Sequence, residues 1–243
     1  MGDEFGGSDV VILHVSEVFG PTFQGEGPYA GRVAMFVRLG GCNLSCSWCD
    51  TPYTWDGVRF SLRHEIAPRL VSDIIDQLDA SPGIVVITGG EPLLQARSEG
   101  FAHLLVELRR RGRYVHIESN GTLLPDGEIL DGFDVIVLSP KLKNAGVHRG
   151  NQDPVLHAGW ADVAQHREVH LKFVCESADD VATAAEMASA LSWPRDRVWV
   201  MPEGTTAQVV GDRLPVIADA AIAAGINVTS RLHVAAWGDE RGR

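Results

Sequence analysis

Six short apolar runs, separated by stretches with helical patterning, are the feature that most constrains the fold of this chain. The segments "IVVIT" and "VIVLS" are typical, because apolar residues occupy almost every position in them. Continuous runs of this length suit strands that are buried on both faces, as in a parallel sheet. The predicted strands span residues 34–39, 84–88, 114–118, 135–138, 170–174 and 198–201.

The segments between these strands have the length and patterning of helices. The predicted helices span residues 66–78, 99–111, 178–191 and 214–224, and an additional strand is predicted at residues 10–19. Strands that alternate with helices imply βαβ units and a parallel sheet. About six such strands fall short of the eight in a closed (β/α)₈ barrel. We therefore expect an α/β fold, a partial and open TIM-type barrel, in one domain at residues 10–243 behind a disordered tail at residues 1–9.

Composition narrows the class of protein. The chain has 243 residues, of which 45% are hydrophobic and 22% charged, as in globular domains with a sizeable core. No apolar stretch is long enough to cross a bilayer, and the N-terminus lacks the features of a signal peptide, so a cytoplasmic location without membrane contact is expected. The net charge of −11 argues against electrostatic capture of nucleic acid. The basic run at residues 109–113 is interpreted as the cationic end of a helix.

Polar and glycine-rich segments follow five of the predicted strands. They are "TGGEP", "ESNGT", "SPK", "PEGT" and the cysteine-containing segment after "AMFVRLGG". The carboxyl ends of parallel strands meet at one edge of a sheet, and active sites of such folds lie there. The sequence therefore predicts an active site built from these five segments.

Three of the four cysteines lie close together in "GGCNLSCSWCD". Cys42, Cys46 and Cys49 have the spacing Cys-x3-Cys-x2-Cys, and three thiolates on one loop can hold a zinc ion or an iron–sulfur cluster. A structural zinc site requires four ligands, and Cys175, the remaining cysteine, has no paired Cys or His beside it. Cys175 follows the apolar run "LKFV" and is predicted to be a buried, inert thiol.

The cysteine spacing, with Trp48 before the last thiol, resembles the radical S-adenosylmethionine superfamily. The resemblance implies a 4Fe-4S cluster whose open iron binds S-adenosylmethionine. It also implies an unidentified one-electron reductant, and a radical that takes a hydrogen atom from the substrate. "TGGEP" resembles the segment that binds the methionine amino group, where Gly89 and Gly90 allow the backbone to approach a ligand.

Residues 16–57, "SEVFGPTFQGEGPYAGRVAMFVRLGGCNLSCSWCDTPYTWDG", are similar to 7-carboxy-7-deazaguanine synthases. The likeness continues through "TGGEPLLQ", "ESNGT", "LSPK", "LKFV" and "RLHVAAWGDERG". It implies that a small-molecule substrate, 6-carboxy-5,6,7,8-tetrahydropterin, is converted to 7-carboxy-7-deazaguanine in 7-deazapurine (queuosine-type) biosynthesis. The ring contracts and ammonia is released. The resemblance also implies Mg²⁺ and a homodimer.

The resemblance assigns the site residues one by one. The cluster ligands are Cys42, Cys46 and Cys49, and the Mg²⁺ ligand is Thr51. Magnesium takes few protein ligands, so one hydroxyl with substrate oxygens suits it. The residues expected to bind S-adenosylmethionine are Trp48, Cys49, Asp50, Gly90, Glu118, Ser139, Pro140, Lys141 and Lys172. The residues expected to bind the pterin are Phe23, Gln24, Gly25, Glu26, Arg38, Thr88 and His233.

Two of the substrate assignments have a chemical reason in the residues themselves. Arg38 stands at the end of a strand just before the cysteines, where its planar fork can pair with a substrate carboxylate. Glu26 in "QGEG" can accept hydrogen bonds from the guanidine-like edge of a pterin.

Two alternatives remain open at this stage. An activating enzyme that abstracts hydrogen from a glycine of a partner protein would share the cysteine triplet, although "FQGEG" and Arg38 suit a small carboxylated ring better. A non-catalytic zinc or redox module is the second alternative. The long polar loop at residues 142–160 has no assigned role.

Overall fold

The computed structural model describes residues 11–151 and 153–243, and the predicted tail at residues 1–9 lies outside this part of the chain. The described strands form one sheet in the order β3-β1-β2-β4-β5-β6-β7-β8-β9. Strands β2 and β4 to β9 run parallel, whereas β1 pairs antiparallel with both β2 and β3. The sheet is open, because β3 and β9 end it at opposite edges. The prediction of a single α/β domain with a partial barrel is confirmed.

The strand bounds follow the predicted runs closely. They are β1 Ile12–Phe23, β2 Val33–Leu39, β3 Ala67–Leu70, β4 Ile84–Gly89, β5 Val115–Ser119, β6 Val135–Leu138, β7 Val169–Cys175, β8 Val198–Pro202 and β9 Asn227–Val228. All six predicted parallel strands are present, and β9 adds a short seventh parallel strand to them.

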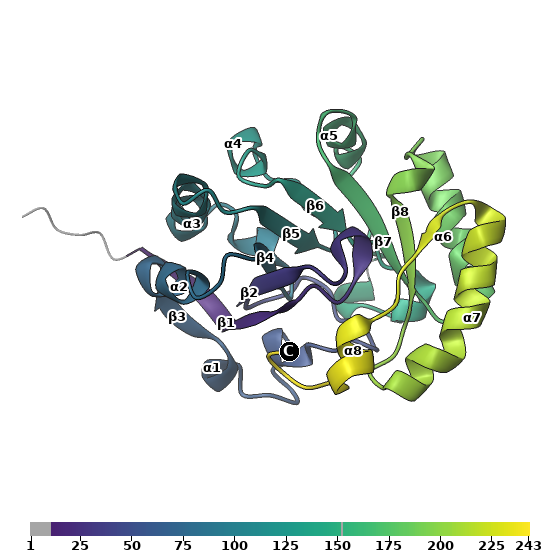
Figure 1. The fold of residues 1–243 in the computed structure, drawn as a ribbon, viewed down its shortest axis with the longest axis horizontal. Helices are drawn as coiled ribbons and strands as arrows, with labels where there is room; N and C mark the ends of the chain where they lie inside the picture. Colours follow the sequence, from purple (N-terminus) through teal and green to yellow (C-terminus); the bar gives the residue numbers. More distant parts are fainter. Residues whose placement is uncertain (1–10, 152) are drawn as a thin grey trace, which may run out of the picture.

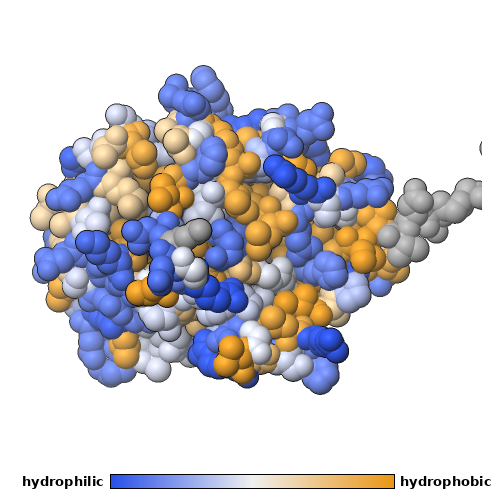
Figure 2. Space-filling view, turned by 180° about the vertical axis from the view of Figure 1, so that it is seen from behind, coloured by the Kyte–Doolittle hydropathy of each residue, from blue (hydrophilic) through white to orange (hydrophobic). Residues whose placement is uncertain are grey.

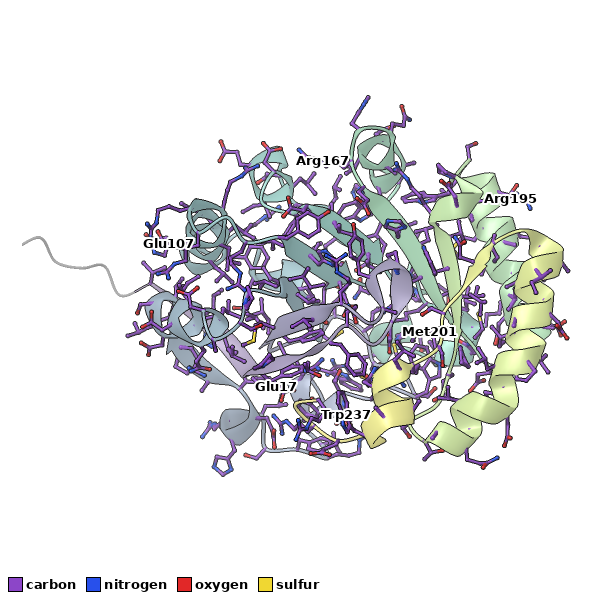
Figure 3. The ribbon with its side chains drawn as sticks, viewed as in Figure 1. Glu17, Glu107, Arg167, Arg195, Met201 and Trp237 are labelled. Atoms are coloured by element: carbon purple, nitrogen blue, oxygen red, sulfur yellow. The ribbon has the colours of Figure 1, made fainter. Side chains whose placement is uncertain are left out.

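Most of the helices lie in an arc along the outside of the curved sheet, whereas α8 lies apart from this arc, near the C-terminus (Figure 1). The helices are α1 Leu62–Glu65, α2 Val71–Leu78, α3 Glu99–Arg110, α4 Gly127–Leu130, α5 Trp160–His166, α6 Ala178–Ala190, α7 Ala207–Ala224 and α8 Leu232–Trp237. In Figure 3 the side chains of Glu107, Arg167 and Arg195 lie along the outer, helical rim, whereas Met201 lies toward the inside of the sheet.

The hydrophobic core lies between the outer face of the sheet and these helices. Strand β2 shows how the two faces divide. Met35, Val37 and Leu39 pack into the main core, while Ala34 and Phe36 belong to a small cluster on the inner face. Both faces are apolar near the middle of the sheet, which explains why the sequence shows continuous apolar runs rather than alternation.

The predicted helix at residues 66–78 is wrong in its first part. Residues Ala67–Leu70 form the edge strand β3, in which Pro68 pairs with His14 of β1, and the helix begins at Val71. Proline lacks the N–H that a helix interior needs and is tolerated on an edge strand.

The predicted helix at residues 214–224 starts too late. Helix α7 begins at Ala207, where the Thr206 side chain accepts a hydrogen bond from the Val209 N–H, and Pro215 lies inside the helix. The end is as predicted, because Gly225 caps the helix with a φ of +65°. Helices α1, α4, α5 and α8 were not predicted.

None of the helices in the described residues combines the length and apolar character that a membrane span requires. Seen from behind, the surface mixes hydrophilic and hydrophobic side chains over most of its area (Figure 2). Scattered apolar residues such as Val58 and Val155 are exposed, as is usual on protein surfaces.

Candidate active site

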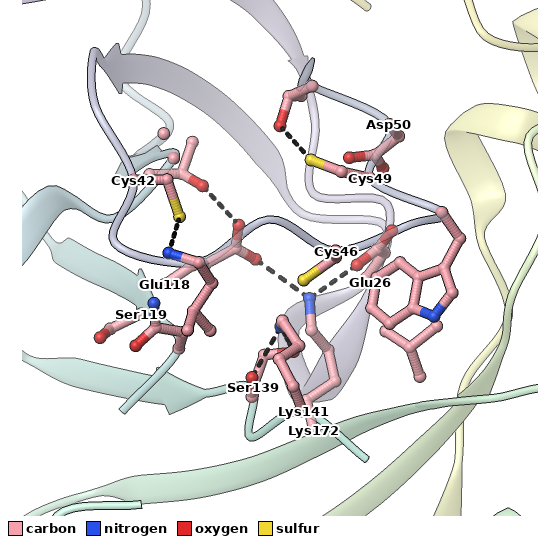
Figure 4. A pocket seen from close by; sticks show the side chains of 18 of the residues that line it. Glu26, Cys42, Cys46, Cys49, Asp50, Glu118, Ser119, Ser139, Lys141 and Lys172 are labelled. Atoms are coloured by element: carbon pink, nitrogen blue, oxygen red, sulfur yellow. Dashed lines mark hydrogen bonds and ion pairs between the residues drawn. The ribbon is translucent and has the colours of Figure 1, made fainter. Parts of the chain in front are cut away.

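A cavity lies where the parallel strands end, and the three clustered cysteines line it (Figure 4). Gly89 at the end of β4, Glu118 and Ser119 at the end of β5, and Met201 in β8 also line it. The position agrees with the general rule that ligands bind beyond the carboxyl ends of strands in open α/β sheets.

The cysteine sulfurs lie in a desolvated environment with few hydrogen-bond donors. The backbone N–H of Leu44 donates to Cys42 Sγ at 3.4 Å, and the Trp55 indole N–H donates to Cys49 Sγ at 3.3 Å. Burial raises the pKa of Cys42 to about 12 and also raises the pKa of Cys46. The thiolate forms therefore need a nearby positive charge, which a bound metal cluster supplies.

The three thiols line one cavity, an arrangement that is compatible with an iron–sulfur cluster. Among residues 11–151 and 153–243, no three His, Cys, Asp or Glu side chains converge closely enough to hold a single metal ion. An iron–sulfur cubane takes one thiolate per iron, so its ligands need not converge on one point. Cys175 instead packs in the main core, fully buried, where desolvation raises the pKa of its thiol.

The "TGGEP" segment is held against the cysteine loop by a close backbone contact. A Cβ on Gly90 would lie 2.2 Å from the carbonyl oxygen of Gly41, and a Cβ on Gly89 would lie 2.3 Å from that of Leu39. The Glu91 N–H donates to the Gly41 carbonyl at 2.8 Å. These glycines are therefore required by the packing of two loops, in addition to any role toward a ligand.

Glu91 joins this segment to "ESNGT" from inside the protein. Its carboxylate accepts hydrogen bonds from Ser119 Oγ at 2.9 Å, the Asn120 N–H at 2.7 Å and the Leu93 N–H at 3.0 Å. Burial raises the pKa of Glu91 despite these donors. Sequence reasoning did not single out Glu91, because a buried acid has no signature of its own in the sequence.

A second cavity adjoins the first, and every residue expected to bind the substrate lines it. These residues are Phe23, Gln24, Gly25, Glu26, Arg38, Thr88 and His233. Of the residues expected to bind the cofactor, all but Pro140 line the first cavity. Next to Pro140, the Lys141 Nζ donates to the carbonyl and hydroxyl oxygens of Ser139 at 2.7 and 2.8 Å and lies 5.7 Å from the centre of the Trp48 ring.

The Arg38 side chain lines the second cavity and forms an ion pair with Glu17. Its Nε donates to Glu17 Oε1 at 2.7 Å, and its guanidinium lies 5.4 Å from the centre of the Phe19 ring. Burial alone would raise the pKa of Glu17, but Arg38 and the Tyr53 hydroxyl outweigh it and lower that pKa. The pair restrains the guanidinium through Nε, and Arg38 lines the second cavity.

A buried group of charges separates the two cavities. Lys172 Nζ lies 2.6 Å from Glu26 Oε2 and 3.4 Å from Glu118 Oε1, between the two carboxylates (Figure 4). Glu118 also accepts hydrogen bonds from Gln24 Nε2 at 3.1 Å and from Thr88 Oγ1 at 3.0 Å. Burial alone would raise the pKa of Glu26, but Lys172 and Arg231 hold it well below its usual range.

The sequence analysis missed Arg231, which belongs to the same group. Arg231 is 6% exposed; it donates to Glu26 through Nε at 2.8 Å and forms an ion pair with Asp50 through Nη2. Its partners are 205 and 181 residues away in the chain, so no local pattern reveals them.

His233 packs directly on the turn that contains Gly25. A Cβ on Gly25 would lie 1.9 Å from His233 Nδ1, and the Leu232 N–H donates to the Gly25 carbonyl at 2.9 Å. The C-terminal segment thereby forms one wall of the second cavity.

Comparisons with known proteins agree with these features. Residues 36–139 match the Radical SAM superfamily, which implies S-adenosylmethionine and a 4Fe-4S cluster. The chain is 38% identical to a 7-carboxy-7-deazaguanine synthase of Pyrobaculum aerophilum over 95% of this chain and 97% of the relative. It is 31% identical to the enzyme of that name from Bacillus subtilis over 95% and 98%. The fold resembles the crystal structure of QueE from Escherichia coli, with a TM-score of 0.66 and 23% identity over 91% and 95% of the two chains.

The full-length similarity extends over both cavities and agrees with the resemblance of the motifs. It supports neither the glycyl-radical activating enzyme nor the non-catalytic zinc module. The chain therefore belongs to the 7-carboxy-7-deazaguanine synthase family, whose members are radical S-adenosylmethionine lyases of deazapurine biosynthesis.

Proposed function

We propose that this chain binds S-adenosylmethionine in the first cavity and 6-carboxy-5,6,7,8-tetrahydropterin in the second, and forms 7-carboxy-7-deazaguanine with ring contraction and loss of ammonia. The observation that carries the proposal is that the two cavities share a wall. Residues that line both are Glu26, Asp50, Thr51, Thr88, Gly89, Glu118 and Arg231. Because the same residues border both cavities, ligands bound in the two cavities would lie next to each other, as hydrogen-atom transfer between them requires.

Cys42, Cys46 and Cys49 are the residues that would hold the 4Fe-4S cluster, because their sulfurs face the first cavity. When bound, the cluster and S-adenosylmethionine supply the radical that takes a hydrogen atom from the substrate. The chain itself binds and orients both molecules and excludes water from the space between them. The ion pair between Glu26 and the buried Lys172 supports this role, since charges beside the cavities act in a largely desolvated setting.

Arg38 is the group best suited to the pterin carboxylate. Its Nε is anchored by Glu17, so the terminal nitrogens keep one orientation at the cavity edge. Glu26 has less capacity to accept hydrogen bonds from the edge of the pterin than the sequence alone suggests. Both of its oxygens already accept from cations, Lys172 on one and Arg231 on the other, which leaves single lone pairs for a ligand.

The shared wall is rich in charged groups. Glu26, Asp50, Glu118 and Arg231 line both cavities, and Lys172 of the first cavity pairs with Glu26 and Glu118. We propose Mg²⁺ at Thr51, whose hydroxyl lines both cavities and lies 3.7 Å from Cys49 Sγ.

Two further parts of the proposal, a homodimer and an external one-electron reductant, rest on the resemblance, and a cytoplasmic location is proposed as well. A size-exclusion measurement of the purified protein tests the first of them.

The function is tested by anaerobic reconstitution with iron and sulfide, followed by incubation with S-adenosylmethionine, Mg²⁺, dithionite and the tetrahydropterin. Mass analysis should detect 7-carboxy-7-deazaguanine, and Cys46→Ala should give none. Cleavage of S-adenosylmethionine without a pterin-derived product would favour a partner protein as the substrate. A colourless protein that binds zinc would refute the enzymatic proposal altogether.

A further inference from the structure

Arg231 stands out in the shared wall because it contacts three separate segments at once. Its Nε donates to Glu26 Oε1 at 2.8 Å, its Nη1 donates to the Gly204 carbonyl at 2.6 Å, and its Nη2 pairs with Asp50. Glu26 belongs to the "QGEG" turn, Asp50 directly follows the last clustered cysteine, and Gly204 follows β8. One guanidinium thus connects the cysteine loop to the substrate turn.

The three contacts require the shape of arginine. The donors on Nε, Nη1 and Nη2 lie in one plane and point in three directions, and each finds a different partner. A lysine ammonium carries the charge but concentrates its donors on one atom, so it cannot reach all three partners.

Without Arg231 the two carboxylates would oppose each other. Glu26 pairs with the Arg231 guanidinium through Nε and Asp50 pairs with it through Nη2, so the guanidinium joins two like charges. Asp50 and Glu26 both line both cavities, so their mutual repulsion would move the cofactor segment and the substrate segment apart.

We infer that Arg231 is a positioning residue that couples the binding of S-adenosylmethionine to the binding of the pterin. The inference rests on the proposed function, which assigns one ligand to each cavity. A ligand in either cavity stabilises the same arrangement of Asp50, Arg231 and Glu26, so each ligand should raise the affinity for the other by the same factor. Removing the guanidinium should abolish this factor while both cavities persist.

The test is calorimetry of the reconstituted, cluster-loaded protein under anaerobic conditions. The dissociation constant of S-adenosylmethionine is measured with and without saturating tetrahydropterin, in the wild type, Arg231→Gln and Arg231→Lys. We expect a wild-type coupling factor on the order of 5 to 150, the usual range for linked sites. The factor should fall to about 1 in Arg231→Gln, and Arg231→Lys should recover only part of it.

The matched control is Arg197→Gln, which removes a partly buried arginine that donates to the carbonyls of Ala164 and Arg167, away from both cavities. Its coupling factor should equal that of the wild type. Iron content and the visible absorbance of each variant verify that the cluster loop has formed.

The possible outcomes distinguish a failure of the inference about Arg231 from a failure of the proposed function. If Arg231→Gln weakens both ligands but leaves the coupling factor unchanged, Arg231 is merely structural and the inference is overturned. The same holds if the wild type binds both ligands independently, or if Arg197→Gln loses coupling equally. If Arg231→Gln does not bind the cluster, the test uses cluster-loaded Arg231→Lys instead. A coupling factor equal to that of the wild type in this variant would also overturn the inference. A wild type that binds no pterin would overturn the proposed function itself.

Discussion

Substitution of Gly25 by alanine tests how tightly the C-terminal segment packs on the substrate turn. The added methyl carbon would lie 1.9 Å from His233 Nδ1 and 2.8 Å from its Cγ, closer than real carbon contacts permit. Overpacking of this kind costs about 1–3 kcal/mol. For a protein of this size, each kcal/mol lowers the melting temperature by about 2–4 °C, so a fall of roughly 2–12 °C is expected.

The measurement is a thermal melt of the reconstituted protein, with Gly211→Ala as the matched control. Gly211 lies in α7 and has open space around its Cα, so alanine there should be neutral or stabilising by up to about 1 kcal/mol. The double variant Gly25→Ala/His233→Ala should recover the lost stability. If the ring of His233 instead swings aside, the stability loss shrinks and pterin binding weakens. Wild-type melting together with wild-type pterin affinity would refute the reasoning.

Three further predictions concern single side chains. Arg38→Ala should raise the pterin KM, with a loss of about 2–5 kcal/mol in kcat/KM, and Arg38→Lys should recover it in part; unchanged kinetics would exclude Arg38 from the site. Thr51→Val should abolish the dependence of the initial rate on Mg²⁺ while iron content stays normal, and an identical Mg²⁺ response in both proteins would contradict this. Burial lowers the pKa of His116, which is 1% exposed, to about 4. The unfolded chain therefore binds the proton more readily than the folded one, and stability should fall as pH decreases from about 6.5 to 4. Urea unfolding at pH 7 and pH 4.5 should show a loss that is larger in the wild type than in His116→Phe, by on the order of 2 kcal/mol; equal losses would be inconsistent with a neutral buried His116.

The central strands were predictable because strands that are buried on both faces appear in the sequence as continuous apolar runs. Strands β4 and β6 are apolar at nearly every position and match their predicted bounds within one residue. The two edge strands, β3 and β9, lack such continuous apolar runs. Strand β3 is exposed over most of its length and contains a proline, and β9 has only two residues, so local patterning cannot identify them.

In the candidate site too, residues within local motifs could be predicted, whereas contacts between residues far apart in the chain could not. The seven residues that were predicted to bind the substrate line one cavity, because most of them lie at or just after strand ends, which converge in this fold. Arg231 is the first residue of the segment "RLHVAAWGDERG", but that segment does not indicate which residues Arg231 contacts. Its importance depends on two carboxylates more than 180 residues away, and contacts over that distance exist only once the sheet has formed.

The long separation between Asp50 and Arg231 also has a consequence for how the protein is made. At translation rates of about 5–20 residues per second, the 181 residues between them take roughly 10–40 s to synthesise. Throughout that interval the cysteine loop exists on the ribosome while the residue that closes the wall behind it does not. The segment that closes the substrate chamber is therefore the last part of the wall to be synthesised.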